Sequence, residues 1–230
     1  MKRTAQFILA FALAASAHAT DRVVSASGTY NTISSAIAAS SDGDRILVEP
    51  GTYTGDVQLD KDLFLLPAVE GARYFLNGSV RVAGGDAPRR VVISGIHAGY
   101  FSTYGGTARL DVVLIDSYFN GVDGYNADPS GKHHIELYRD SIPTGIILRS
   151  GSAYGCVIGG FIATTQSAVN VYGTTTLTDP VRIVGNELAY TPSYSTNSAY
   201  SIHVTASVPF QIDNNYVNVW VSSSKFIQVD

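Results

Sequence analysis

A short apolar unit recurs six times between Val91 and Val217. Each copy carries one apolar residue and a second apolar residue five positions further on. The six pairs are Val91 and Ile96, Val113 and Tyr118, Leu137 and Ile142, Cys156 and Phe161, Ile183 and Leu188, and Ile212 and Val217. From copy to copy the first residue advances by 22, 24, 19, 27 and 29 positions. A repeat of this length is typical of a solenoid, in which each copy stacks on its neighbours.

The position three residues after the first apolar residue carries types that mostly favour turns. In order, these residues are Ser94, Asp116, Asp140, Gly159, Asn186 and Asn215. The unit therefore predicts a short strand, a corner and a second short strand. It also predicts that Val113, Leu137, Cys156 and Ile183 line one interior column, with the single cysteine acting as a small core residue.

Composition favours β-structure over helix. Only 15% of the residues are charged, whereas the chain contains 22 glycines and 14 tyrosines. Strands are predicted at residues 45–49, 57–59, 63–66, 80–82, 146–148, 169–171 and 202–204, where apolar residues alternate or run together. One amphipathic helix is predicted over residues 31–41, because Ile33, Ala36 and Ile37 follow helical spacing and Asn31 or Thr32 can cap its start.

Residues 1–19 have the pattern of a secretory signal peptide. Lys2 and Arg3 precede an apolar run over residues 7–15, and Ala17 and Ala19 form a small-x-small cleavage site. We therefore expect a secreted or periplasmic protein, with residues 20–230 forming one domain and no transmembrane segment in it. Without Lys2 and Arg3 the chain has 13 basic and 19 acidic residues, a formal charge of −6. This balance argues against nucleic acid as a partner.

The segment from Thr32 to Tyr53 resembles a known superfamily. The sequence Thr-Ile-Ser-Ser-Ala-Ile at 32–37, followed by Gly-Asp-Arg-Ile-Leu-Val-Glu-Pro-Gly-Thr-Tyr at 43–53, is similar to the opening of pectin-lyase-like proteins. The resemblance implies a right-handed parallel β-helix, with a short N-terminal helix as its cap and coils over residues 45–230. The same superfamily includes polysaccharide lyases, hydrolases, esterases, epimerases and noncatalytic adhesins, so the resemblance does not select one activity.

The insertion at residues 121–134 is the first candidate site. It gathers Lys132 and His134 as candidate catalytic residues, Tyr125 and Asn126 as candidate sugar ligands, and Asp123 and Asp128 as a candidate calcium pair. A solvated polar loop is the alternative interpretation. His133 and His134 are expected on opposite faces of a strand. An inward Leu137 makes Ile135 inward and places His134 and Glu136 outside.

Asp116 and Asp140 are the second candidate. If they share one corner position in neighbouring coils, their carboxyl groups lie close enough for glycosidase chemistry. The alternative is that each caps a turn, with Arg139 offsetting the charge. Tyr138 and Arg139 complete the candidate substrate-binding residues, since exposed tyrosine rings suit sugar faces.

Two functions stay open at this point. The first is a protein that binds or processes a polysaccharide, with Lys132 or His134 as the base of a lyase and calcium as a possible cation. The second is a noncatalytic adhesin or structural module on a cell-surface glycan. The apolar residues Phe226, Ile227 and Val229 have no obvious capping element after them, which predicts either a continuing chain or a homo-oligomer through the C-terminal end.

Overall fold

The computed structural model describes residues 19–124, 132–159, 167–173, 179–190, 200–206, 209–219 and 225–229. Within these ranges the chain is all-β apart from one short helix, which confirms the predicted all-β class. The strands pair in parallel throughout, as the repeat predicts. No helix in the described part has the length and apolar character needed to cross a membrane.

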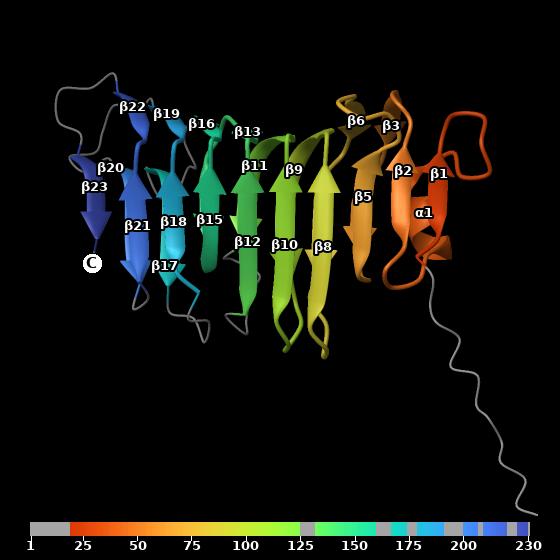
Figure 1. Ribbon diagram of the computed structural model, residues 1–230, viewed down its shortest axis with the longest axis horizontal. Helices are drawn as coiled ribbons and strands as arrows, with labels where there is room; N and C mark the ends of the chain where they lie inside the picture. The colour runs from red at the N-terminus through yellow and green to blue at the C-terminus, as the bar shows by residue number, and fades with distance from the viewer. Residues whose placement is uncertain are drawn as a thin grey trace, which may run out of the picture.

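One sheet contains nine described strands, which follow one another in chain order across Figure 1. They are β1 (Asp21–Val24), β2 (Arg45–Val48), β5 (Leu63–Pro67), β8 (Arg89–Ser94), β10 (Leu110–Ile115), β12 (His133–Tyr138), β15 (Ser150–Tyr154), β18 (Val181–Val184) and β21 (Phe210–Asp213). These bounds match the predicted strands at 45–49 and 63–66 to within one residue.

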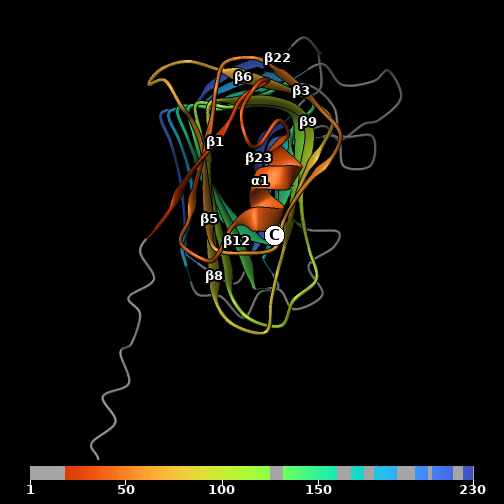
Figure 2. The same cartoon turned by 90° about the vertical axis from the view of Figure 1, so that its right-hand side faces the viewer.

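The second sheet contains fourteen strands among the described residues. They are β3 (Thr52–Thr54), β4 (Val57–Leu59), β6 (Tyr74–Asn77), β7 (Val80–Ala83), β9 (Ile96–Tyr104), β11 (Tyr118–Gly124), β13 (Ser141–Ile142), β14 (Ile146–Leu148), β16 (Val157–Gly159), β17 (Ser167–Gly173), β19 (Glu187–Tyr190), β20 (Tyr200–Ala206), β22 (Tyr216–Val219) and β23 (Lys225–Val229). The chain crosses from one sheet to the other and back, so each pass adds strands to both. Figure 2 looks along the stacked passes, with the two sheets forming facing walls.

An interior column runs along the nine-stranded sheet, but the repeat placed only part of it correctly. The residues that pair across the strands are Ile93, Leu114, Leu137, Ala153, Ile183 and Ile212. Leu137 and Ile183 are fully buried there, as predicted. Val113 is not in the column, because it pairs with Glu136 on the outer face and Leu114 takes the interior position.

The predicted spacing of five residues within each unit is nevertheless correct. Each interior residue of the nine-stranded sheet is followed five positions later by one of the second sheet, as for Leu114 and Phe119 or Ala153 and Ile158. Cys156 was predicted in the column but lies at the corner, three residues after Ala153. The repeat was therefore right in its spacing and wrong by one to three residues in the register of three copies. Phe161 lies outside the described residues.

The corner after each of these strands uses a left-handed backbone conformation. Six residues occupy this position with positive φ angles of 52 to 68°: Gly95, Asp116, Arg139, Gly155, Gly185 and Asn214. Each of the first five donates its backbone N–H to the carbonyl of the residue before the corner in the next pass, as Asp116 does to Tyr138 at 2.9 Å. Glycine and asparagine suit this conformation, whereas Arg139 adopts it at some cost.

Asparagine side chains at the next corner position bond to backbone groups of the preceding pass. The Oδ1 atom of Asn215 accepts the backbone N–H of Asn186 at 3.0 Å, and that of Asn186 accepts the backbone N–H of Cys156 at 2.8 Å. Their Nδ2 groups donate to the carbonyls of Ile183 and Ala153, respectively. Each amide thus satisfies backbone groups of the preceding pass and joins two successive corners.

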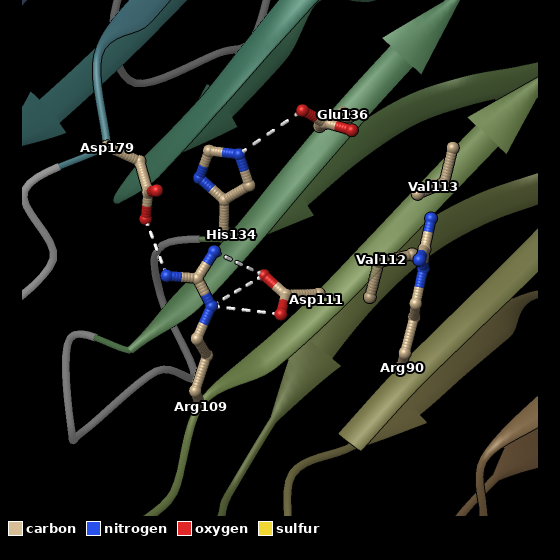
Figure 3. Close-up of a pocket in the computed structure, with 8 residues that line it drawn as sticks. All are labelled: Arg90, Arg109, Asp111, Val112, Val113, His134, Glu136 and Asp179. Carbon is tan, nitrogen blue, oxygen red and sulfur yellow. Dashed lines mark hydrogen bonds and ion pairs between the residues drawn. The ribbon is translucent and has the colours of Figure 1, made fainter. Parts of the chain in front are cut away.

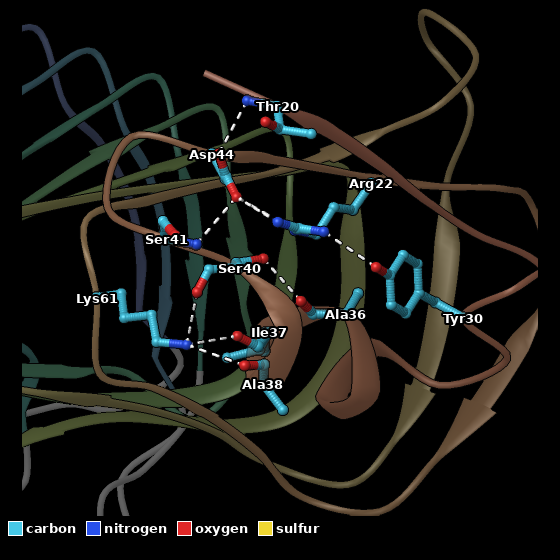
Figure 4. Close-up of polar contacts among 10 residues, drawn as sticks. All are labelled: Thr20, Arg22, Tyr30, Ala36, Ile37, Ala38, Ser40, Ser41, Asp44 and Lys61. Atoms are coloured by element: carbon cyan, nitrogen blue, oxygen red, sulfur yellow. Dashed lines mark hydrogen bonds and ion pairs between the residues drawn. The ribbon is translucent and has the colours of Figure 1, made fainter. Parts of the chain in front are cut away.

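The predicted helix is α1 (Ile33–Ala39), and its N-cap is Thr32, whose hydroxyl accepts the N–H of Ser35. It covers the N-terminal end of the space between the sheets (Figure 2), with Ile33, Ala36 and Ile37 buried. Lys61 holds its C-terminal end, because its ammonium donates to the carbonyls of Ile37, Ala38 and Ser40 (Figure 4).

The nine-stranded sheet begins before this helix, at β1, whereas the coils were predicted to start only at residue 45. Strand β1 pairs with β2, and a buried carboxylate joins their ends. Asp44 accepts the backbone N–H groups of Ser41 and Thr20 and pairs with Arg22 at 3.0 Å (Figure 4). The bond from Ser41 contributes most to lowering the pKa of Asp44.

Candidate functional site

The outer face of strand β12 carries three polar side chains in a row. Ile135 and Leu137 are fully buried, so the alternating residues His134, Glu136 and Tyr138 lie on the opposite face. This confirms the predicted orientation of His134 and Glu136. His133 points into the interior, where its ring contacts Thr103 and the carbonyl of Gly105, so the two histidines do lie on opposite faces.

His134 and Glu136 line a groove of about 220 Å³ on this face (Figure 3). Four further charged residues border it: Arg90, Arg109, Asp111 and Asp179. They come from neighbouring strands because the register places Asp111 beside both Arg90 and His134. The sequence alone did not single out these four residues, since the register that brings them together was unknown.

A clamped guanidinium forms one wall of the groove. Arg109 donates from Nε to both oxygens of Asp111 at 2.8 and 2.9 Å, and its Nη1 lies 2.7 Å from Oδ2 of Asp179. The bond to Asp111 is the main cause that raises the pKa of Arg109. Asp179, just before β18, thus reaches back to the start of β10. In the described part of the chain the guanidinium of Arg90 makes no comparable pair.

His134, Glu136 and Tyr138 form a chain of polar contacts. The Nε2 atom of His134 lies 3.7 Å from Oε1 of Glu136, and the hydroxyl of Tyr138 donates to Oε2 at 3.3 Å. The other ring nitrogen, Nδ1, lies 2.8 Å from the hydroxyl of Ser150. Burial and, next, the charge of Glu136 raise the pKa of Tyr138. The hydroxyl of Tyr138 therefore orients the carboxylate of Glu136, and the hydroxyl of Ser150 orients the imidazole of His134.

Tyr138 is also stacked on Tyr154 of the neighbouring strand, with 5.0 Å between ring centroids and 14° between planes. Because the rings stack along the direction in which the passes succeed one another, they cover each other's faces and turn their edges outward. Tyr138 thus offers a hydroxyl to a ligand more readily than a ring face. This differs from the flat sugar platform that the sequence suggested for it.

Lys132 is not part of the groove. Its ammonium donates to the carbonyl of Thr107 at 2.7 Å, in the connection that leads to β10. Asp123, a predicted calcium ligand, lies on β11, where its cross-strand neighbours are Ser102 and Ile147. Tyr125, Asn126 and Asp128 lie outside the described residues. Among those that are described, no group of three or more histidine, cysteine, aspartate or glutamate side chains is arranged to hold a metal ion.

The predicted pairing of Asp116 and Asp140 at one corner position is wrong. Asp116 occupies the left-handed position, and its register partner is Arg139 rather than Asp140. The two form a bidentate pair with distances of 2.7 and 2.6 Å, so the predicted role of Arg139 as counter-charge is confirmed. This pair lowers the pKa of Asp116. The carboxylates therefore do not face each other as a glycosidase pair.

Asp140 instead occupies the corner position that asparagine holds in later passes. Its Oδ1 accepts the N–H of Ser117 at 2.8 Å and its Oδ2 accepts that of Tyr138 at 3.0 Å. The residue is only 1% exposed, and burial raises its pKa to about 7. A carboxyl group enclosed in this way cannot reach a substrate, so Asp140 has a structural role, as the alternative interpretation held.

In comparisons with known proteins, no family model, curated protein or solved structure matches this chain significantly. The site is therefore interpreted from its own geometry. The groove combines three carboxylates, two guanidinium groups, an imidazole and, next to it, a phenol on a rigid sheet.

Proposed function

We propose that this protein is an exported right-handed parallel β-helix that binds a polysaccharide in the groove beside His134 and Glu136. The observation that carries the proposal is the arrangement of fixed hydrogen-bonding groups on one exposed sheet face. Sugar hydroxyl groups donate and accept at once, so carboxylates and guanidinium groups held in place by neighbours suit them. The parallel strands and repeated left-handed corners are consistent with the proposed fold.

Individual groove residues have distinct roles in this proposal. Glu136 is already oriented by the hydroxyl of Tyr138 and accepts a sugar hydroxyl. Arg90 donates to the next sugar unit, because its guanidinium is not held by a described carboxylate. Arg109 stays fixed by Asp111 and Asp179 and shapes the wall. Preorganised groups of this kind lose little freedom on binding.

A calorimetric binding screen of residues 20–230 tests the proposal. The ligands are neutral and uronate oligosaccharides, each measured with and without calcium. We expect Arg90→Ala and Glu136→Gln to weaken binding about tenfold each. Arg81→Ala removes an exposed arginine from the other sheet and serves as the matched control. Binding that is absent, or that is equal in all variants, would overturn the proposed site.

Cleavage of the bound chain is a second candidate function, supported by the contact between His134 and Glu136. In this version His134 removes or delivers a proton at Nε2, and Glu136 stabilises the charged ring. Asp116, Asp140 and Lys132 have no part in it. The expected signature is loss of product formation in His134→Gln with retained glycan binding. If no product forms at high protein concentration, binding alone is the function.

A further inference from the structure

The outer face of the fourteen-stranded sheet carries a row of aromatic rings, on a different sheet from the groove. Phe75, His97 and Tyr118 are paired across β6, β9 and β11. The rings of His97 and Tyr118 stack with centroids 4.1 Å apart and planes 16° apart. Phe75 continues the row, with its centroid 5.1 Å from that of His97.

Both ends of this row have open ring faces. The next cross-strand residue beyond Phe75 is Thr52, and the next beyond Tyr118 is Ser141. Neither side chain is large enough to cover a six-membered ring. Phe75 is accordingly 45% exposed, a large value for an aromatic residue on a sheet.

Tyr100 adds a fourth ring beside the row. Its cross-strand neighbour is Gly121, and the ring occupies the space of the missing side chain. Its Cε1 and Cδ1 atoms lie 2.8 and 3.2 Å from the place where a Cβ of residue 121 would be. The ring nevertheless stays 54% exposed. Gly121 is therefore needed for close approach, and any larger residue there would displace Tyr100.

The row is neutral and has polar groups at its margin. Burial and, secondly, the charge of Arg73 lower the pKa of His97, which keeps its imidazole uncharged near neutral pH. The hydroxyl of Tyr118 donates to Oδ1 of the exposed Asn120 at 3.2 Å. Uncharged rings beside an amide match a ligand with apolar C–H faces and hydroxyl groups at its edge. A charged uronate matches this surface less well than it matches the groove.

We infer that Phe75, His97, Tyr100 and Tyr118, here called the aromatic face, form a second binding site that takes neutral sugar units by stacking. The open faces at the two ends of the row and the ring of Tyr100 receive the sugar rings, and Asn120 contacts their hydroxyl groups.

The test compares variants of the two faces in residues 20–230 by calorimetry. The probes are cellohexaose, xylohexaose and mannohexaose as neutral chains and hexagalacturonate as the anionic chain. We expect Tyr100→Ala combined with Tyr118→Leu to weaken binding of at least one neutral probe tenfold or more. Tyr216→Ala, which removes a 65% exposed tyrosine outside the aromatic face, should leave that affinity unchanged.

Glu136→Gln, measured in parallel, separates this inference from the groove. If binding of the neutral chains is lost only in the tyrosine variant, the result supports the aromatic face even if the groove binds nothing. If binding of the neutral chains is lost only in Glu136→Gln, the result supports the groove and overturns the aromatic face. No neutral binding at all, or a sedimentation shift showing that the tyrosine variant has lost self-association instead, would also overturn it.

Discussion

The two sides of the nine-stranded sheet obey different constraints. On the inner side, Leu114, Leu137 and Ile183 stack in one buried column. On the outer side the corresponding stretch changes from the apolar Val113 to the charged Glu136 and Arg182. Burial fixes the apolar type of the inner residues, whereas the outer side carries apolar and charged residues alike. Function is therefore expected outside and stability inside, and substitutions at five positions test this division.

The largest effect is expected from a charge placed on the inner side. Ile183→Asp buries a carboxylate without a partner and should cost more than about 4 kcal/mol, enough to unfold the adjacent passes. Arg182→Asp makes the same change one residue away on the outer side and should cost less than about 1 kcal/mol. Circular dichroism during urea unfolding measures both. Equal losses in the two variants would refute the assignment of the faces.

Asp140 occupies the corner position that asparagine holds in later passes, so a substitution at Asp140 tests the role of this corner. Its pKa of about 7 in the folded protein is higher than the unfolded value of about 3.9, so ionisation opposes folding. The stability it contributes is complete below about pH 4 and is lost as the pH rises through about 7.

Asp140→Asn should abolish this pH dependence, because an amide cannot ionise. Its Oδ1 can still accept the N–H of Ser117, as Asn186 and Asn215 do at their corners, whereas the N–H of Tyr138 loses its acceptor. We expect a loss on the order of 1 kcal/mol at pH 4 and a gain on the order of 1 kcal/mol at pH 8. Thermal unfolding at both pH values provides the measurement. If the stability of the variant still differs between pH 4 and pH 8 as much as that of the unmodified protein, another group is responsible for the pH dependence.

The left-handed corner position should produce a smaller effect. Gly185 has a φ of +67°, and a Cβ there would meet no atom within 4 Å, so any cost comes from the backbone alone. Gly185→Ala should therefore lose about 1 kcal/mol in urea unfolding. Gly185→Asn should lose less, since Asn214 already adopts this conformation. If Gly185→Ala leaves the free energy of unfolding unchanged, Gly185 does not adopt the left-handed conformation described for this corner.

The smallest effect is expected at the exposed pair of Arg139 and Asp116. Their side chains are 63% and 50% exposed, so solvent screens the pair and Arg139→Ala should leave the stability nearly unchanged. The same substitution removes the main cause that lowers the pKa of Asp116. An NMR titration should therefore show the pKa of Asp116 rising. A large loss of stability with an unchanged pKa would contradict this account of the pair.

The sequence was sufficient to predict the class of fold and the length of the repeat. It failed in the register of the copy at Val113 because β10 is apolar on both faces. Val112 and Leu114 point inward while Val113 and Ile115 point outward, and periodicity cannot separate them. The position of Cys156 was predicted wrongly for a related reason. A small apolar residue stands at this corner, where the neighbouring passes carry polar residues.

The candidate site was predicted only in part. His134, Glu136 and Tyr138 follow from alternation along one strand, which is a local signal. Asp179 contacts Arg109 across 70 residues of sequence, and no local pattern indicates such a contact. Arg90 and Asp111 become neighbours of His134 only once the register is known.

Cross-linking across β10 and β12 tests this register most directly. Val113 and Glu136 are paired on the outer face, so Val113→Cys combined with Glu136→Cys should oxidise to a disulfide. Cys156 is buried and burial raises the pKa of its thiol to about 12, so it should not compete. Ile115→Cys with Glu136→Cys, offset by two residues, should stay reduced. Mass spectrometry showing the offset bond, or no bond at Val113 and Glu136, would contradict the stacking of the passes.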